Sequence, residues 1–249
     1  MRSDFDGLNV VVTGSGSGIG LELCQQLNSF GARVFGLDLS AGELGDSGTW
    51  ISCDVGSTAS VKKAFEEVFS LVSVIDIVAN NAGISAVGSV EEATDEQWAQ
   101  VMNVNVVGMS RISAAAMPGL RKSKSPSIVN TCSIAATAGL PKRAIYSASK
   151  GAVLSLTLAM AADYVKEGIR VNCVNPGTAD TPWVKKLLAQ AADPDAERKA
   201  LELRQPMGRL VSSSEVANAI LYLANPRQSS TTGTALAVDG GMQGLRLPR

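Results

Sequence analysis

The 249-residue sequence contains no histidine. Hydrolysis by a serine–histidine–aspartate triad, metal binding by histidine ligands and catalysis by a histidine base all require imidazole chemistry near neutral pH, so all three are excluded. Aromatic residues are also scarce, at 4% of the chain, which disfavours a pocket walled by rings for a steroid or polyaromatic ligand. Any chemistry must therefore use other side chains.

Neither positive charge nor cysteine is abundant. The 22 basic and 23 acidic residues give a formal net charge of −1, without the basic excess that is typical of nucleic-acid binders. The four cysteines, Cys24, Cys53, Cys132 and Cys173, are dispersed and form no CxxC motif. This spacing favours buried, reduced thiols in a cytoplasmic protein over a disulfide framework or a metal site. We expect no nucleic-acid partner and no metal.

Long hydrophobic runs are absent as well. The first residues interleave charges with apolar side chains, unlike a signal peptide. The most apolar stretch, residues 151–162, lies between Lys150 and Asp163, and its twelve residues fall short of the roughly 20 that a membrane-spanning helix needs. The sequence therefore predicts a cytoplasmic protein with no membrane partner.

Short runs rich in β-branched residues alternate with longer amphipathic stretches, which is the pattern of βα units built around a parallel sheet. We expect strands near residues 8–12, 33–37, 50–53, 74–79, 127–131, 169–174 and 234–238, and helices near 18–30, 58–70, 95–121, 146–166 and 214–224. The length suits a single α/β domain over residues 1–249. The charged stretch from about 178 to 208 is too long for an ordinary connection, so we expect a substrate lid with short helices there.

A glycine-rich segment, Thr13 to Gly20, leads from the first expected strand into the first expected helix. A helix amino terminus presents unpaired N–H groups and a positive dipole, which together stabilise a phosphate. The spacing is TGxxxGIG and not GxGxxG, because Ile19 stands where a third glycine would be needed. The position between strand and helix favours pyrophosphate binding over a purely structural turn. The expected cofactor contacts are Gly14, Ser15, Ser17, Gly18, Ile19 and Gly20.

An acidic residue, Asp38, ends the second expected strand, eighteen residues beyond Gly20. A carboxylate there can accept hydrogen bonds from both hydroxyls of an adenosine ribose. It would repel the 2′-phosphate of NADP, and Leu39 and Ser40 bring no positive charge to offset that repulsion. The pattern favours NAD, although a solvated acid at a strand end remains the alternative. Asp54, after the third expected strand, is similarly placed to meet the adenine.

Together these motifs resemble those of the short-chain dehydrogenase/reductase family, in its compact subgroup, over nearly the whole chain. The matching segments are Thr13 to Gly20, Asp54-Val55, Asn80-Asn81-Ala82-Gly83, Asn105, Ser133, Tyr146-Ser-Ala-Ser-Lys150, Asn175-Pro176-Gly177 and Val238-Asp239-Gly240-Gly241. The resemblance implies a doubly wound Rossmann domain with a seven-stranded sheet, a nicotinamide cofactor, and a homotetramer formed through the helices near 95–121 and 146–166 and the last strand. It also implies a catalytic set of Asn105, Ser133, Tyr146 and Lys150, and cofactor contacts from Asp54, Val55, Asn80, Ala82, Gly83, Tyr146, Lys150, Pro176, Gly177 and Thr178.

The residue chemistry agrees with these catalytic roles. Tyr146 and Lys150 are four apart on an expected helix, so they project from one face. A phenol is a poor base at neutral pH, and a nearby ammonium favours its ionised form. Ser133 can hydrogen-bond the reacting oxygen, and the resemblance gives Asn105 a helix distortion and a water that links Lys150 to solvent. Without the other motifs, a surface Tyr–Lys pair and a capping serine would be the better interpretation.

The substrate is suggested by two arginines. Arg143 lies three residues before Tyr146 and Arg204 follows the expected lid, and a guanidinium suits a carboxylate. Both match positions in a subgroup that contains cytosolic hydroxybutyrate dehydrogenases and 2-keto-3-deoxy-sugar-acid (fuconate/rhamnonate) dehydrogenases. A third basic position of that subgroup falls near Leu187 here, which leaves Lys185 or Lys186 as replacements. Ordinary surface cations remain the alternative.

We therefore predict NAD-dependent oxidation of a small hydroxy acid, such as a 2-keto-3-deoxy sugar acid, with Ser133, Arg143, Tyr146 and Arg204 binding the substrate. The alternatives are a neutral-sugar dehydrogenase, an NADPH-dependent 3-ketoacyl-type reductase and a non-catalytic nucleotide sensor. We also hypothesise that the tail, residues 244–249, reaches the substrate cleft of a neighbouring subunit.

Overall fold

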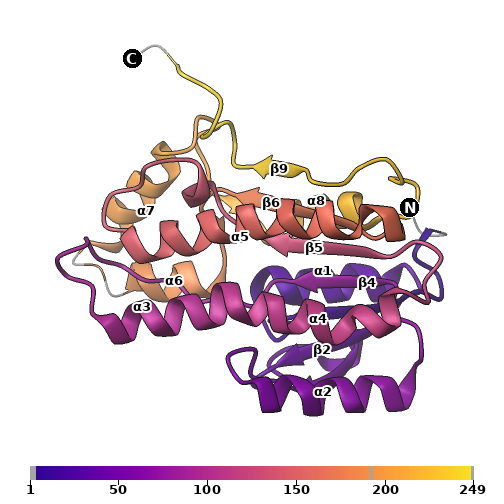
Figure 1. Cartoon of the computed structure of the whole chain (residues 1–249). Helices are drawn as coiled ribbons and strands as arrows, with labels where there is room; N and C mark the ends of the chain where they lie inside the picture. The colour runs from indigo at the N-terminus through magenta and orange to yellow at the C-terminus, as the bar shows by residue number, and fades with distance from the viewer. Residues whose placement is uncertain (1–3, 190, 192, 248–249) are drawn as a thin grey trace.

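The computed structural model describes residues 4–189, 191 and 193–247, except for the side chain of Leu187. Seven parallel strands form one sheet in the order β3-β2-β1-β4-β5-β6-β9 (Figure 1). Their bounds are β1 Asn9–Thr13, β2 Arg33–Asp38, β3 Thr49–Ser52, β4 Ile77–Asn80, β5 Ser127–Thr131, β6 Arg170–Pro176 and β9 Ala235–Val238. The strand order reverses beside β1, which pairs with β2 on one side and β4 on the other, so this is the switch point at which doubly wound sheets bind ligands.

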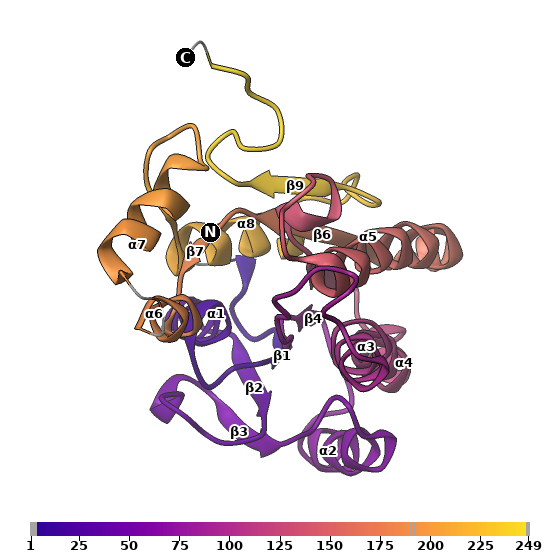
Figure 2. The same cartoon turned by 90° about the vertical axis from the view of Figure 1, so that its left-hand side faces the viewer.

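Helices cover both faces of the sheet. They are α1 Gly18–Ser29, α2 Thr58–Leu71, α3 Asp95–Met102, α4 Gly108–Leu120, α5 Ala144–Tyr164, α6 Pro182–Ala189, α7 Pro194–Leu203 and α8 Ser213–Ala224. Helices α1 and α8 pack together on one face, whereas α2, α4 and α5 lie on the other (Figure 2). The single doubly wound α/β domain expected from the sequence is confirmed.

Two apolar cores separate these layers because alternate strand residues point to opposite faces. Val10 and Val12 belong to the core under α1 and α8, while Val11 belongs to the core under α2, α4 and α5. The central strands β4, β5 and β6 are buried along their entire length, as expected for strands covered on both faces. This packing fixes the carboxyl ends of β1, β4, β5 and β6, where the site is built.

The helix expected at 95–121 is interrupted in the structure. A five-residue π-helical segment, η3 Asn103–Val107, separates α3 from α4. Such insertions are uncommon and often lie at functional sites. The physical reason is the buried Asn105, whose side chain bonds the main chain of a neighbouring loop instead of facing solvent. Helix α3 starts at a capping box between Thr94 and Gln97.

The expected lid consists of α6 and α7, which enclose a small core of their own made by Val184, Leu188, Leu201 and Leu210. At its base, β7 Ala179–Asp180 pairs in parallel with β8 Val211–Ser212. This short sheet was not expected from the sequence because neither strand is long enough to show a periodicity. It joins the two ends of the lid to each other.

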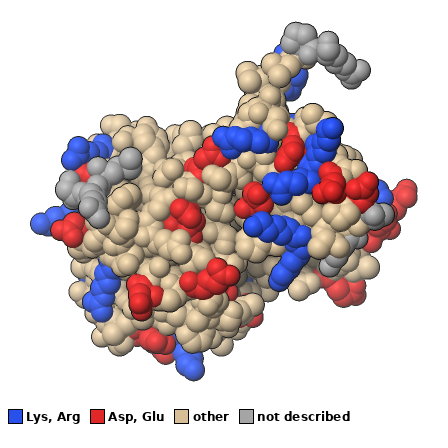
Figure 3. All heavy atoms as spheres, turned by 180° about the vertical axis from the view of Figure 1, so that it is seen from behind, with Lys and Arg blue, Asp and Glu red and all other residues tan. Residues whose placement is uncertain are grey.

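Two arginines in and beside the lid form ion pairs. Arg198 contacts Asp180 at 3.2 Å and Glu202 at 3.0 Å, and Arg209 contacts Glu215 at 2.7 Å. On the face seen in Figure 3, basic and acidic side chains are intermixed beside the base of the projecting tail. Because the charges alternate in sign, no large single-sign patch is visible on this face.

Helix α5 is the longest element. With the turn that follows, Ala144–Glu167, it spans 24 residues and contains an 18-residue window with a mean hydropathy of 1.2, so by length and composition alone it is able to cross a membrane. The twelve-residue limit inferred from the sequence was therefore too short, because the helix continues through Lys150 and Asp163. Since α5 packs on β6 and carries both Tyr146 and Lys150, we interpret it as a core helix.

Candidate active site

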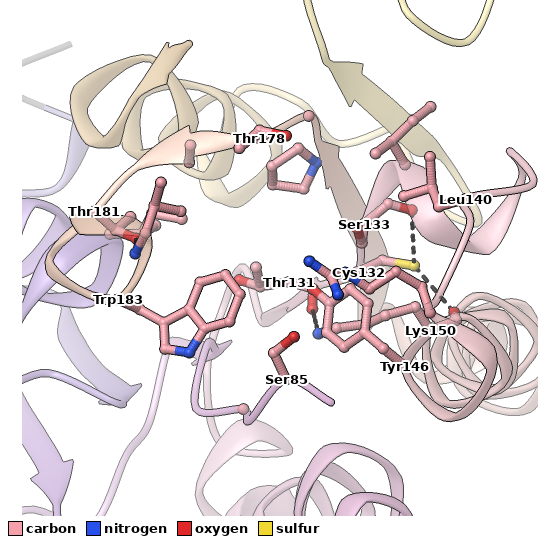
Figure 4. A pocket seen from close by; sticks show the side chains of 18 of the residues that line it. Ser85, Thr131, Cys132, Ser133, Leu140, Tyr146, Lys150, Thr178, Thr181 and Trp183 are labelled. Carbon is pink, nitrogen blue, oxygen red and sulfur yellow. Dashed lines mark hydrogen bonds between the residues drawn. The ribbon is translucent and has the colours of Figure 1, made fainter. Parts of the chain in front are cut away.

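A cleft of about 250 Å³ opens at the carboxyl ends of the central strands (Figure 4). It runs from the glycine loop, past the ends of β5 and β6, to the amino-terminal end of α5 and the base of the lid. The lining residues are Ile19, Asn81, Gly83, Ile84, Ser85, Thr131, Cys132, Ser133, Ile134, Leu140, Arg143, Tyr146, Lys150, Pro176, Gly177, Thr178, Ala179, Thr181, Trp183, Val184, Leu201 and Arg204. The cleft thus brings together the expected catalytic tyrosine, lysine and serine and both expected substrate arginines.

Tyr146 and Lys150 project from the first turns of α5 toward the same cleft. The Lys150 Nζ atom lies 5.6 Å from the centre of the Tyr146 ring and donates a hydrogen bond of 2.8 Å to the carbonyl oxygen of Thr131. Lys150 is 4% exposed, so its ammonium is held beside the phenol with little screening by solvent.

Ser133 lines the cleft and is the second residue beyond the end of β5. Its Oγ accepts a hydrogen bond of 3.1 Å from the backbone N–H of Ala135, which fixes the hydroxyl at the start of a short 3₁₀ turn. The accepted bond leaves the hydroxyl proton available for donation. Ser133 is therefore oriented to hydrogen-bond an oxygen that gains negative charge in the cleft.

Asn105 does not line the cleft. It is fully buried in η3, where its Nδ2 donates to the Ile84 carbonyl at 2.8 Å and its Oδ1 accepts from the Ile84 N–H at 2.8 Å. A further bond of 3.1 Å reaches the Ser149 Oγ, next to Lys150. Asn105 therefore positions the loop after β4 against α5, and the water relay that the resemblance implies stays a prediction.

The glycine loop is shaped by close backbone approach. Gly14 has φ +67°, and a Cβ there would lie 2.9 Å from the Cα of Ala82. Asn81, which the sequence analysis did not select, donates to the carbonyl oxygens of Thr13 and Gly14 at 3.2 Å and lines the cleft. Its position in the Asn-Asn-Ala-Gly motif is the sequence signal from which Asn81 could have been predicted.

The amino terminus of α1 fits a phosphate. Ser17 is the N-cap, and no described side chain caps the helix or places an acid in its first turn. The N–H groups of Gly18, Ile19 and Gly20 therefore face an uncapped end with a positive dipole. Ser15 is fully buried and its Oγ has no partner among the described residues, so it shapes the loop interior.

The two expected acidic contacts lie side by side at the ends of β2 and β3. Asp38 accepts hydrogen bonds from the N–H groups of Gly16, at 2.9 Å, and Leu39, at 2.7 Å. Asp54 accepts from the N–H of Gly56 at 2.8 Å. Their charges and, above all, burial raise the pKa of Cys53, between the two strand ends, to about 11.

The remaining expected cofactor residues divide into two groups. One group lies at or just beyond the ends of β4 and β6, and all of its members but Ala82 line the cleft: Ala82, Gly83, Pro176, Gly177 and Thr178. Asn80 instead is 1% exposed, and its side chain donates to Ser113 and Asn130 in the interior. Val55 is a buried residue of the core under α2 and α4. The side chains of Asn80 and Val55 thus support the site from behind.

Both substrate arginines reach the cleft. Arg143 immediately precedes α5 and Arg204 immediately follows α7. Burial, and next the charge of Arg204, lower the pKa of Arg143, while Tyr146 and Glu197 act in the opposite direction. The two guanidinium groups are close enough to repel each other, so an anion bound between them would offset that repulsion.

The other predicted basic contacts are not brought to the site. Lys185 and Lys186 are exposed on α6 and do not line the cleft, and the side chain of Leu187 lies outside the described residues. Trp183, from the same helix, does line the cleft and faces Tyr146 across it, with Ser85 at the edge between them (Figure 4). Sequence reasoning missed Trp183 because a lone tryptophan in an irregular segment carries no motif.

Comparisons with known proteins agree with this geometry. Residues 14–243 match the family model described as enoyl-(acyl carrier protein) reductase. The chain is 35% identical over 247 residues to 2-(S)-hydroxypropyl-CoM dehydrogenase 3 of Xanthobacter autotrophicus, covering 95% of this chain and 96% of the relative. The chain belongs to the short-chain dehydrogenase/reductase family.

Two solved structures of this family show how closely the fold is shared. A ligand-free aldohexose dehydrogenase of Thermoplasma acidophilum has a TM-score of 0.92 and 33% identity, with 99% of each chain covered. An actinorhodin polyketide ketoreductase, solved with NADPH, has a TM-score of 0.90 and 30% identity, covering 97% of this chain and 99% of the other. Membership in this family makes the protein an oxidoreductase that binds a nicotinamide cofactor.

Proposed function

We propose that this short-chain dehydrogenase/reductase interconverts a secondary alcohol and a ketone in a small hydroxy acid, with NAD as its cofactor. One observation supports the proposal above all: Arg143 and Arg204 line the same cleft as Ser133 and Tyr146. The arginines supply an anion site beside the groups that handle the reacting oxygen, as an acid with a nearby hydroxyl requires.

The chemistry follows from the described side chains. A bound NAD would supply the acceptor for the hydride that leaves the carbon of the alcohol. Tyr146 removes the hydroxyl proton, the ammonium of Lys150 stabilises the resulting charge, and Ser133 hydrogen-bonds the same oxygen. The uncapped amino terminus of α1 would hold the pyrophosphate of the cofactor, and the carboxylate of Asp38 would hold its adenosine ribose. In reduction, Tyr146 returns the proton.

The length and polarity of the acid are open to test. A 2-keto-3-deoxy sugar acid is the substrate that the resemblance favoured. The cleft walls offer Ile84, Ile134, Leu140, Val184 and Leu201, which favour an acid with a short aliphatic chain as the second candidate. Each sugar hydroxyl buried there without a partner would cost about 1–3 kcal/mol. A panel of hydroxy acids, sugar acids and neutral sugars, assayed by NADH absorbance, separates these possibilities.

The anion site is tested by Arg143→Ala. Losing a charge-assisted contact of about 1.5–3 kcal/mol is expected to raise KM for the acid about 10- to 100-fold. KM for the uncharged methyl ester of the same acid should change less than threefold. Arg227→Ala serves as the control, because Arg227 pairs with Asp4 at the surface and does not line the cleft. Equal losses on the acid and its ester would reject the anion site.

The preference for NAD is tested at Asp38. Its carboxylate is fixed by two backbone N–H groups beside the glycine loop, where a 2′-phosphate would meet like charge. We expect kcat/KM to be at least 100-fold higher with NAD than with NADP, and Asp38→Ser to reduce that ratio at least tenfold. An NADPH-dependent reductase would show the opposite preference in the wild type and little response to the substitution.

Three further features complete the proposal. The presence of Tyr146, Lys150 and Ser133 in one cleft favours an enzyme over a nucleotide sensor, which would need no such set.

We also propose a cytoplasmic homotetramer, supported by the exposed Leu158 on α5 and by the outer edge of β9, which has no partner strand among the described residues. Residues 244–247 project from the body, as a tail directed toward a neighbouring subunit would, and residues 248–249 lie outside the described part (Figure 1).

A further inference from the structure

One buried polar side chain at the cleft is used by no step described above. Gln205 follows Arg204 at the end of the lid and is only 1% exposed. Its Nε2 donates to the carbonyl oxygen of Thr178 at 3.3 Å and to that of Arg209 at 2.7 Å. The Oε1 atom is buried and has no partner among the described residues. Burying a primary amide without pairing its oxygen is costly, so the position calls for an explanation.

The neighbour of this oxygen is Gly177. A Cβ added to Gly177 would overlap the Gln205 Oε1, and the next nearest atom would be the Cα of Asp239 at 3.1 Å. The amide oxygen therefore occupies the place that a side chain at position 177 would take, and Gln205 itself is not among the residues that line the cleft. Gly177 and Thr178 themselves line the cleft between β6 and the lid. Gln205 is thus packed behind the two residues expected at the nicotinamide end of the cofactor.

Backbone hydrogen bonds also hold the peptide formed by Gly177 and Thr178. The Gly177 N–H donates to Val238 of the sheet at 3.0 Å, and the Thr178 carbonyl also accepts from the Val211 N–H at 3.0 Å. The Gln205 side chain adds a contact to each residue, since its Oε1 lies beside Gly177 and its Nε2 donates to the Thr178 carbonyl. Its own backbone carries on from Arg204, whose guanidinium reaches the cleft. One side chain therefore joins the sheet side of the cleft to the lid side.

We propose that Gln205 is a positioning residue, whose amide holds the Gly177–Thr178 peptide at the depth that the nicotinamide half of the cofactor requires. It touches neither substrate nor cofactor. Removing the amide leaves the Thr178 carbonyl with the Val211 N–H as its described donor and takes the polar oxygen away from Gly177, so the floor of the cleft shifts at the nicotinamide end. The glycine loop, on the other side of the switch point, is not contacted by Gln205 and keeps its shape.

The test compares two ligands that share the adenosine diphosphate half. The reduced cofactor that the wild type prefers, NADH or NADPH, is titrated by fluorescence, and ADP-ribose or its 2′-phosphate is titrated by calorimetry. In Gln205→Met, which keeps the volume but removes both amide groups, Kd for the reduced cofactor should rise at least fivefold, while Kd for the ADP-ribose ligand stays within twofold. Gln100→Met is the matched control, because Gln100 is exposed on α3.

Gln205→Glu provides a second variant with the same shape. Its carboxylate places an acceptor where Nε2 donates, facing the carbonyl oxygens of Thr178 and Arg209. At pH 8 the weakening of reduced-cofactor binding should be at least as large as in Gln205→Met, and it should become smaller at pH 6, where a protonated carboxyl can again donate.

Either of two results would overturn the proposal: unchanged binding of both ligands, or equal weakening of both, which would give Gln205 a general structural role. The measurement needs no substrate. An incorrect assignment of the hydroxy acid or of NAD would therefore show in the activity assays without altering the ratio of the two dissociation constants.

Discussion

At the scale of single residues, the absence of histidine and the geometry of the cleft point to the same proton carrier. Tyr146 is the titratable side chain that faces the open part of the cleft beside Ser133, and Lys150 is buried behind it with its Nζ fixed on the Thr131 carbonyl. No described residue offers an imidazole to relay a proton, because the chain has none. In the proposed mechanism, proton transfer therefore depends on a phenol and an ammonium held by one helix.

This dependence predicts the behaviour of Tyr146→Phe. Removing one hydroxyl eliminates the proton carrier, so kcat should fall about 10²- to 10⁴-fold. The ring remains, and binding of the reduced cofactor, measured by fluorescence, should change less than threefold. Tyr164→Phe, at the other end of the same helix, is the control and should keep full activity. A Tyr146→Phe enzyme that retained wild-type turnover would remove Tyr146 from the mechanism.

At the scale of elements, the spacing of apolar residues along the sequence predicted the strands and helices whose positions depend on that spacing. The seven long strands and the helices near 18–30, 58–70 and 214–224 agree with the structure to within a few residues, because buried faces impose a regular spacing of apolar side chains. The π-helical turn at Asn105, the β7–β8 pair and the placement of Gln205 depend on contacts with residues distant in the chain. Motifs found Tyr146, Lys150 and Ser133, whereas Trp183 and Gln205 became visible only once the lid was placed against the sheet.

The start of α8 gives an element-scale prediction about pH. Ser212 and Glu215 form a capping box, and Arg209 contacts the Glu215 carboxylate at 2.7 Å. The hydrogen bond from Arg209, with those from Ser212, lowers the pKa of Glu215 to about 2. Because the folded state holds the carboxylate ionised below its usual range, the stabilisation is complete above about pH 4.5 and is lost as the pH falls toward 2.

Glu215→Gln should therefore reduce stability most at neutral pH. Loss of the charged cap is expected to cost about 1 kcal/mol, or about 2–4 °C in Tm, at pH 7. Thermal denaturation at pH 7, 5 and 3 should show the gap between wild type and variant narrowing at the lowest pH. Glu66→Gln, at an exposed side chain 4.0 Å from Lys62, is the control without such a gap. A gap that stayed constant with pH would show that the charge of Glu215 is not the stabilising feature.

At the scale of the whole molecule, the isolated chain leaves apolar surface where the site is supported. Helix α5 carries Tyr146 and Lys150 on its buried side, while Leu158 on the same helix is 50% exposed. Val107, in the π-helical segment that holds Asn105, is 43% exposed. At the end of the sheet, β9 pairs with β6, and its outer edge has no partner strand among the described residues. A partner subunit covering these surfaces would rigidify the two helical segments that hold the catalytic groups.

Leu158→Glu tests this link between assembly and catalysis. A charge on the proposed subunit contact should reduce the mass measured by light scattering from four times 25.8 kDa to a smaller species, because an unpaired carboxylate is costly to bury. Circular dichroism should be unchanged, since Leu158 is half exposed in the single chain. Leu71→Glu, at the end of α2 and 42% exposed, is the matched control and should leave the mass unaltered. If α5 needs its partner to keep Tyr146 and Lys150 in their relative positions, kcat falls together with the mass. A dissociated protein with full activity would show that one chain alone keeps the catalytic geometry.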